Sequence, residues 1–425
     1  MSILATAVFV PGSFPKHTYV ERAQGLEGLL RDAVNTPGMV VSLVGPSKSG
    51  KTVLVEKVVG RDLLIPVSGA GVRHPDDVWN RVLDWMDVPD STSRKTMSGT
   101  TIGAEAGASG GLSMPWVAKG EVSGAVSAEL TGEHGTEAAR GHQGLQQVVR
   151  EIANSDFVVL LDDFHYMPRE VQDEVAKSLK EGVRLNVKVV TAAVSHRGDD
   201  VVRANPELRG RVRAIDLRYW SREELRAIAV AGFNVLNAEC SPVAIDVFVD
   251  ESAGSPQLMQ QMCLQACFAA GVRERTLPGK TITLDWHGLQ QVLEHTSATT
   301  DFRSLVDVLD AGPRTRGIER KTYTFMDDTK GDVYRTVLKA VAADPPKLSF
   351  PYDELLARTA EMCVGDSPVG SSVSVSCVHM SKLAQDKFPN ERAIDWDEQK
   401  QVLDIPDPYL LFYLRWSGRL HEDNA

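Results

Sequence analysis

The chain has 425 residues, of which 43% are hydrophobic and 24% charged, and its formal net charge is −11. These values are typical of globular proteins, and the length predicts roughly two to three domains. The negative charge opposes nonspecific attraction to nucleic acid or anionic lipid, although it is compatible with a local basic face. No apolar run reaches the roughly 18 residues that span a bilayer, and the start of the chain lacks the basic residues of a signal peptide. We therefore expect no membrane partner, and the five cysteines, which form no C-x-x-C pair, indicate the reducing cytoplasm.

A phosphate-binding pattern stands near the start of the chain, after a helical pattern at 17–36. Residues 39–44 form a short, apolar, β-branched run that predicts a strand, and residues 53–59 can continue as a helix. Between them lies a full match to G-x-x-x-x-G-K-[ST] in the strand–loop–helix context that this motif requires. Its residues are Gly45, Pro46, Ser47, Lys48, Ser49, Gly50, Lys51 and Thr52.

The chemistry of this loop follows from its residue types. Glycines at both ends let the backbone curl so that successive N–H groups point into one concavity, where the helix dipole adds positive potential. Lys51 can then reach the β- and γ-phosphates of a nucleotide, and the Thr52 hydroxyl can ligate Mg²⁺. The motif therefore predicts ATP and Mg²⁺ as cofactors. A chance glycine-rich turn is the less favoured alternative.

The elements after the loop are interrupted by a glycine-rich segment. A strand is expected at 63–67 and a helix at 76–87, and a further helix at 145–153. Between them, residues 91–144 hold 11 of the 34 glycines, with period-two alternation that suggests a hairpin of weakly defined register. We favour a surface insertion with no dedicated role over a hairpin that orders against a partner.

Two acids end the next buried strand. Residues 157–161 are followed directly by Asp162 and Asp163, and then by a helix at 170–184 and a strand at 187–194. Strands that alternate with helices indicate a parallel sheet covered on both faces, with its ligand at the carboxyl ends of the strands. We assign Asp162 to the metal and Asp163 to the attacking water. The alternative is that the pair is merely a turn or an N-cap.

Two further contributions to catalysis are predicted from topology. Ser195 or Thr191, at the strand 187–194, can hydrogen-bond the γ-phosphate or the water. Arg209 and Arg211 precede a strand at 214–217, and an arginine there can reach a phosphate across a subunit boundary. A solvated basic turn is an equally good interpretation of the two arginines.

In this order of motifs the chain resembles the AAA+ and STAND branches of the P-loop ATPases, over roughly residues 17 to 275. Gly254-Ser255-Pro256 is similar to the Gly-x-Pro motif of STAND lids. The resemblance implies an ATPase with a helical lid in which Val53 and Pro256 contact the nucleotide, and which forms a homo-oligomer or acts on a partner protein. Asp163 stands where many AAA+ members carry glutamate, which implies that hydrolysis can be slow.

The last third resembles a winged helix. Helices at 332–343, 352–363 and 375–388 precede two segments, 401–405 and 409–416, that we interpret as a strand pair. Residues 331–425 hold ten basic and fifteen acidic residues, a net charge of −5, and the candidate recognition helix offers only Lys382 and Lys387. A DNA site typically neutralises on the order of six to ten phosphates, so a protein-contacting role is favoured over DNA binding.

The predicted fold class is α/β, a P-loop NTPase parallel sheet with a helical lid and a C-terminal winged-helix domain. The expected divisions are an ATPase core, a lid, a linker and a winged helix at 1–220, 221–310, 311–330 and 331–425. The leading hypothesis is an ATP-dependent switch that controls oligomerisation or a partner. Its rival is a DNA-binding or DNA-remodelling ATPase of the origin-recognition or transposition-regulator type. A role in phage defence is implied by the resemblance to STAND relatives alone.

Overall fold

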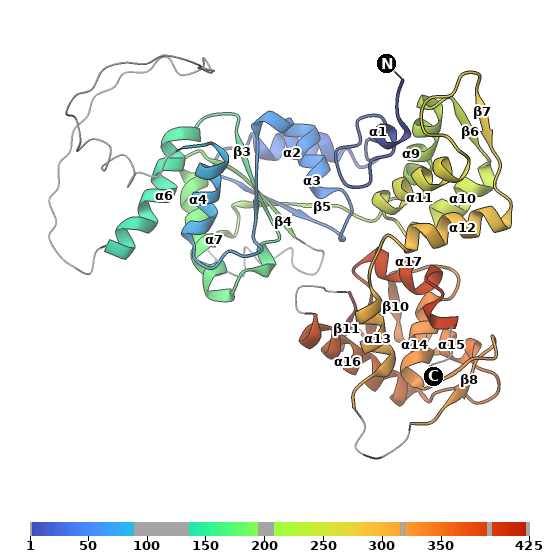
Figure 1. Cartoon of the computed structure of the whole chain (residues 1–425). Helices are drawn as coiled ribbons and strands as arrows, with labels where there is room; N and C mark the ends of the chain where they lie inside the picture. The colour runs from blue at the N-terminus through green and yellow to red at the C-terminus, as the bar shows by residue number, and fades with distance from the viewer. Residues whose placement is uncertain are drawn as a thin grey trace, which may run out of the picture.

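The structure is a computed structural model that describes residues 2–88, 136–193, 208–314, 317, 320–388 and 393–421. Figure 1 shows a sheet-containing unit, a helical unit beside it and a C-terminal unit below. Most of the predicted insertion at 91–144, with its hairpin, lies outside the described residues, and so does Ser195.

A five-stranded parallel sheet forms the centre of the first unit, in the order β2-β3-β4-β1-β5. The three central strands β3, β4 and β1 are almost wholly buried and mainly apolar, as expected for a sheet with helices on both faces, whereas the edge strand β5 is largely exposed. The bounds of the strands in this sheet are β1 Val40–Val44, β2 Leu64–Ser68, β3 Val158–Asp162, β4 Lys188–Ala193 and β5 Val212–Asp216.

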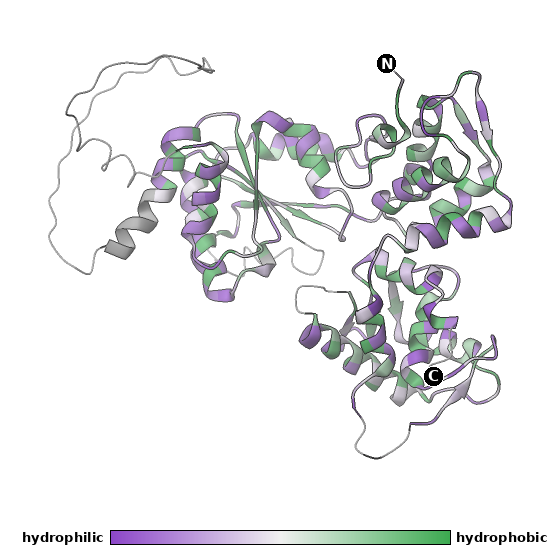
Figure 2. Cartoon of the chain, viewed as in Figure 1, coloured by the Kyte–Doolittle hydropathy of each residue, from purple (hydrophilic) through white to green (hydrophobic). Residues whose placement is uncertain are grey.

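Helices cover both faces of this sheet. One face packs against α2 (Leu26–Val34) and α3 (Lys51–Val59), and the other against α4 (Asp76–Trp85), α6 (Thr136–Ile152) and α7 (Arg169–Arg184). Apolar residues line the strands and the inner sides of the helices, while polar residues face outward (Figure 2). The predicted α/β class with a covered parallel sheet is confirmed.

The helix α6 begins earlier than predicted. It starts at Thr136, inside the segment that we assigned to the insertion, rather than near residue 145. Gly144 lies against α4, where an added Cβ atom would make only ordinary contacts, 3.4 Å from Asn80 Oδ1 and 3.5 Å from Trp79 Cβ. Glycine has a low helix propensity, so the glycines at 141 and 144 weaken the helical pattern of the sequence just before residue 145.

The second unit is helical and contains a small parallel strand pair. Its apolar core includes Cys263 and Cys267, and both thiols are free and buried. Cysteines in this setting behave as small apolar residues. The elements are α9 Arg222–Val235, β6 Ala238–Cys240, α10 Pro242–Glu251, α11 Pro256–Ala269, β7 Lys280–Ile282 and α12 Trp286–Ser297, with the N-terminal α1 Ala5–Val8 in the same core.

The third unit packs helices against a small antiparallel sheet of order β10-β12-β11. Leu305, Val306 and Leu309 of α13 (Arg303–Ala311) belong to its core. Its other elements are β8 Tyr323–Thr324, β9 Lys330–Gly331, α14 Val333–Ala342, β10 Ser349–Pro351, α15 Tyr352–Met362, α16 Gly370–Lys387, β11 Asp395–Asp397, β12 Val402–Asp404 and α17 Pro408–Trp416. Among the described residues, none of the helices is both long and apolar enough to cross a membrane.

The strand predicted at 409–416 is wrong, because this segment is the helix α17. The Asp407 side chain accepts a hydrogen bond from Tyr409 N, and Pro408 occupies the first turn, so local capping starts a helix. Tyr409 and Phe412 pack into the core of the helical unit, whereas Leu410 and Leu414 pack into the core of the C-terminal unit. A helix buried on both sides has no polar face, and periodicity alone does not separate it from a buried strand.

A buried ion pair holds the end of α17 against the helical unit. The Arg415 guanidinium donates to both Glu251 oxygens at 2.9 and 2.7 Å, and the two side chains are only 8% and 7% exposed. Trp416 Nε1 also donates to Glu251, at 2.6 Å. Glu251 ends α10, just before the Gly254-Ser255-Pro256 turn.

We expect Glu251→Ala to lower the free energy of unfolding by about 3 kcal/mol, because it removes the buried partner of Arg415 and leaves this guanidinium only the exposed Asp344 carboxylate and the Ala342 carbonyl. Denaturant unfolding followed by circular dichroism measures this loss. The matched control is Glu181→Ala, which removes an exposed ion pair with Arg184 and should change the midpoint little. Equal losses in the two variants would contradict the buried-pair interpretation.

Candidate functional site

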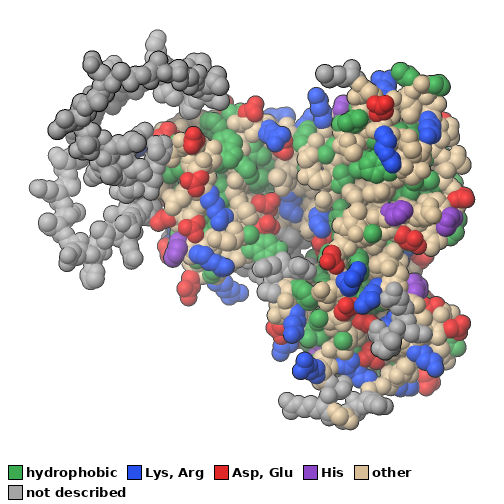
Figure 3. Space-filling model, in the orientation of Figure 1, with side chains coloured by type: hydrophobic (Ala, Val, Ile, Leu, Met, Phe, Trp, Pro, Cys, Tyr) green, Lys and Arg blue, Asp and Glu red, His purple; other side chains and the backbone are tan. Residues whose placement is uncertain are grey.

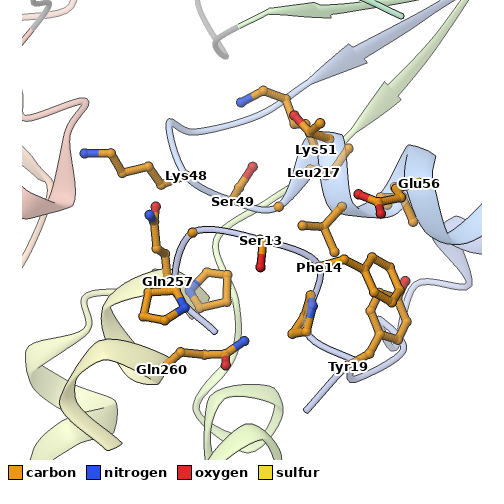
Figure 4. A pocket seen from close by; sticks show the side chains of 18 of the residues that line it. Ser13, Phe14, Tyr19, Lys48, Ser49, Lys51, Glu56, Leu217, Gln257 and Gln260 are labelled. Atoms are coloured by element: carbon orange, nitrogen blue, oxygen red, sulfur yellow. The ribbon is translucent and has the colours of Figure 1, made fainter. Parts of the chain in front are cut away.

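A cavity of about 640 Å³ lies between the phosphate loop and the helical unit. Residues 47–54 of the loop and of α3 line one side, together with Asp162 and Asp163 at the end of β3. Residues of the segment 10–22 and the first turn of α11 line the other side (Figure 4). The cavity therefore sits at the carboxyl ends of parallel strands, where the topology predicts a ligand.

The phosphate loop needs glycine at its first position for a steric reason. A Cβ atom on Gly45 would lie 2.5 Å from the backbone oxygen of Leu217, the residue that follows β5. The backbone N–H of Leu217 donates to Val44 O at 2.6 Å, which holds the two strand ends together. Gly50 has a positive φ of 92°, which glycine adopts without steric cost, and α3 begins at the next residue.

Lys51 is held inside the loop. Its ammonium donates to the carbonyl oxygens of Gly45 and Pro46 at 3.0 and 2.8 Å. Burial lowers the pKa of Lys51, and the nearby carboxylates of Asp162 and Asp163 oppose this effect. An ammonium in such a position gains from a multiply charged phosphate, which is a stronger acceptor than a carbonyl oxygen.

Thr52 and Asp162 meet although 110 positions separate them in sequence. Thr52 Oγ1 donates to Asp162 Oδ2 at 3.1 Å, and the backbone N–H of Asp163 donates to Asp162 Oδ1 at 2.9 Å. A hydroxyl and a carboxylate are hard oxygen donors of the kind that Mg²⁺ prefers. The donor set therefore fits the metal that the sequence predicts.

Asp163 has an unusual backbone conformation and environment. Its φ of 58° lies in the left-handed region, and Gly69 allows the close approach, because a Cβ there would lie 2.5 Å from Asp163 O. Burial, followed by the neighbouring Asp162 charge, raises the pKa of the Asp163 carboxyl, which Lys51 partly opposes. A raised pKa makes a carboxylate a better proton acceptor.

The remaining predicted residues are distributed as follows. Pro256, at the start of α11, and Val53 line the cavity. Thr191 is buried in the sheet, where its hydroxyl donates to Val41 O at 3.4 Å, and it does not line the cavity. Arg209 and Arg211 are exposed and precede β5, at the edge of the sheet opposite the loop, so they cannot act on the cavity of their own chain. Their role across a subunit boundary stays a prediction.

The segment 10–22 forms a wall of the cavity that was not predicted from the sequence. The helix expected from residue 17 begins only at Leu26, after Gly25 with a φ of 64°. The preceding residues instead bring Phe14 and Tyr19 into the cavity with stacked rings, 5.8 Å between centroids. Tyr19 is fixed by its hydroxyl, which donates to Glu27 at 2.6 Å. Gly25, inside the predicted range, was the available signal against a continuous helix.

Trp220 links the phosphate loop to the helical unit. Its Nε1 donates to the carbonyl oxygen of Ser49 at 2.9 Å, and the guanidinium of Arg22 lies over its ring at 4.6 Å. Trp220 N donates to Gly254 O at 3.2 Å. A Cβ on Gly254 would lie 2.8 Å from Tyr219 Cβ, so glycine is needed for this contact. The Gly254-Ser255-Pro256 turn is therefore packed directly on the segment that follows β5.

Comparison with protein families and with curated sequences gives no match for this chain. Solved structures do resemble it. A Walker-type ATPase of Pyrococcus abyssi is 14% identical over 93% of this chain and 96% of its own, with a TM-score of 0.51. The ORC2 protein of Aeropyrum pernix, solved as ADPNP and ADP complexes, is 11% identical over 98% of each chain, with a TM-score of 0.50. At these identities the likeness shows the fold alone: the five-stranded parallel sheet with its phosphate loop is that of P-loop NTPases.

We expect Gly45→Ala to abolish nucleotide binding while the chain still folds, because the added Cβ collides with the Leu217 backbone and displaces the loop. Isothermal titration with MgATP measures binding, and circular dichroism checks the fold. Gly28→Ala in α2 is the control, since nothing lies within 4 Å of its added Cβ. Unchanged affinity in Gly45→Ala would show that the loop does not bind phosphate in this conformation.

Proposed function

We propose that the chain binds ATP·Mg²⁺ in the cavity, hydrolyses it slowly, and uses the bound nucleotide to set the arrangement of its three units. The observation that carries this proposal is the contact of Thr52 with Asp162 directly beside Lys51. A phosphate loop alone fits many nucleotide-binding proteins. A metal-binding pair at the carboxyl ends of the adjoining strands is what ATP hydrolysis needs in addition.

Each residue of the site has a proposed task. The loop amides and Lys51 would bind the β- and γ-phosphates, and Thr52 and Asp162 would hold Mg²⁺. The metal ion, when bound, neutralises charge on the phosphate oxygens. Asp163, whose pKa is raised, would orient the attacking water and accept its proton. Ser195 is proposed as a further phosphate or water contact from the end of the strand at 187–194.

The walls of the cavity away from Lys51 and Asp162 favour binding of the nucleobase. Phe14 and Tyr19 present a stacked aromatic pair, and Val53 and Pro256 add apolar surface. The N–H of Val10 and the hydroxyl of Thr18 donate to Gln260 Oε1 at 2.8 and 3.0 Å, which fixes the orientation of this amide. Aromatic and apolar walls with a few oriented polar groups are typical of small-molecule sites.

We expect Lys51→Ala to weaken MgATP binding at least tenfold, because a buried ammonium facing the phosphates is lost. Isothermal titration measures the affinity. Equal affinity in the wild type and Lys51→Ala would overturn the proposed function.

Asp162→Asn is the companion variant in this experiment. It keeps the shape of the side chain and removes the charge that Mg²⁺ requires, so nucleotide binding should lose its Mg²⁺ dependence while Mg²⁺-free binding persists. Lys180→Ala is the control, because Lys180 lies on α7 and does not line the cavity. It should leave the affinity for nucleotide unchanged, both with and without Mg²⁺.

A homo-oligomer is proposed as one output of the switch. Arg209 and Arg211 are exposed at the edge of the sheet opposite the phosphate loop, a placement that suits action on the nucleotide of a neighbouring copy. If so, the mass in solution should rise with a nonhydrolysable ATP analogue relative to ADP, and Arg209→Ala with Arg211→Ala should lower turnover without weakening ATP binding. A mass that is the same with both nucleotides would contradict this output.

The C-terminal unit is proposed to be a winged helix that contacts protein. Its order of α14, β10, α15, α16, β11 and β12 supports the winged-helix interpretation. The helix α16 exposes Val375 at 52% alongside Lys382 and Lys387, a poor match to a phosphate backbone. Basic and acidic side chains are interspersed on the face that Figure 3 shows. The rival proposal of DNA remodelling therefore has less support, and salt-sensitive, ATP-dependent binding of duplex DNA would restore it.

A further inference from the structure

We infer that Asp407 and Tyr409 of α17 withhold Lys48 from the nucleotide, so that phosphate and Asp407 compete for one ammonium group. The inference rests on the proposed function and assigns to the C-terminal unit a direct part in the phosphate site. Asp407 is a positioning residue in this account, because it acts on the nucleotide through Lys48.

The contact joins residues that lie 359 positions apart. Lys48 Nζ donates to Asp407 Oδ1 and Oδ2 at 3.1 and 2.9 Å, and it lies 4.1 Å from the centre of the Tyr409 ring. The two charged side chains are 32% and 21% exposed. In Figure 4, Lys48 extends away from the other labelled lining residues, toward the red ribbon of the C-terminal unit. The ammonium is thus engaged by a carboxylate and an aromatic face together.

The backbone of Lys48 makes this side chain unusual. Its φ of 59° lies in the left-handed region, where a side chain other than glycine, asparagine or aspartate costs on the order of 1 kcal/mol. Glycine at this position would remove that cost. A strained lysine in the middle of a phosphate loop therefore points to a use for its charge.

Asp407 is held in place from its own side. Its Oδ1 accepts from Tyr409 N at 2.9 Å as the N-cap of α17, so the carboxylate is oriented before Lys48 arrives. This carboxylate also places negative charge beside a cavity that must accept phosphates. Both effects weaken nucleotide binding: Lys48 is neutralised, and the phosphates are repelled.

The C-terminal end of α17 is attached to the helical unit, so a change at its N-terminal end can affect that unit. Arg415 pairs with Glu251, which stands just before the Gly254-Ser255-Pro256 turn at the cavity. A nucleotide that draws Lys48 away removes the link between the phosphate loop and the N-cap of α17, while the last turn of α17 stays attached to Glu251. Nucleotide binding and the position of the C-terminal unit are thereby coupled, and by linkage each affects the other equally.

The test is a double-mutant cycle on the full chain. Asp407→Asn is the matched variant, since asparagine is as good an N-cap as aspartate and α17 keeps its start while the charge is lost. Affinities for MgADP and MgATP are measured for the wild type, Asp407→Asn, Lys48→Ala and the double variant, and thermal unfolding checks that each folds. We expect Asp407→Asn to bind nucleotide about fivefold more tightly than the wild type. In the Lys48→Ala background the same exchange should have an effect of less than about twofold.

The outcomes separate this inference from the proposed function. Suppose that Lys51→Ala abolishes nucleotide binding but Asp407→Asn leaves the affinity unchanged or lowers it. The proposed competition between phosphate and Asp407 for Lys48 is then overturned, whereas the proposed nucleotide site is supported. If Asp407→Asn tightens binding equally with and without Lys48, general repulsion explains the effect and the role of Lys48 is overturned. If neither the wild type nor Asp407→Asn binds nucleotide, both proposals fail. Binding by Asp407→Asn alone would support both, with the wild type held closed by Asp407.

Discussion

The close approach of the phosphate loop to the end of β5 is the constraint on which the arrangement of the molecule depends. Gly45 lies against the backbone of Leu217 because β5 pairs with β1, and only a residue without a Cβ fits there. The two residues after Leu217 then lead to Trp220, whose indole donates to Ser49 O of the loop. Sheet pairing therefore determines where the helical unit begins and which of its surfaces faces the cavity.

Two neighbouring residues of the loop contact two different units. The Ser49 carbonyl accepts from Trp220 at the start of the helical unit, and the Lys48 ammonium pairs with Asp407 at the start of α17. A ligand that moved this loop would therefore disturb contacts with both units at once. No long chain of intermediate contacts is needed for coupling, since α17 packs into both apolar cores.

Local sequence patterns predicted the parts of the site that are local. The loop, its flanking strand and helix, and the acids at the end of β3 depend on short-range chemistry, and parallel topology brought Thr52 and Asp162 together as expected. The sequence carried no comparable signal for Asp407, which reaches the loop from 359 positions away. The segment at 409–416 was misassigned for the same reason: burial against two cores removes the polar face by which an amphipathic helix is recognised. The aromatic wall at Phe14 and Tyr19 comes from an irregular segment, where periodicity gives no information.

Under the proposed function, the acids of the site would favour a bound nucleotide that is hydrolysed slowly. Both oxygens of Asp162 accept hydrogen bonds, from Thr52 and from Asp163 N, so this carboxylate is oriented in advance for a metal ion. The backbone N–H of Asp163 is engaged by Asp162 Oδ1, and the backbone of Asp163 has a left-handed conformation. Its side chain is one methylene shorter than glutamate, so it reaches less far toward a water in line with a γ-phosphate. A metal-binding carboxylate that is oriented in advance, next to a proton acceptor of short reach, is consistent with the proposed switch, in which the nucleotide-bound state would have to persist.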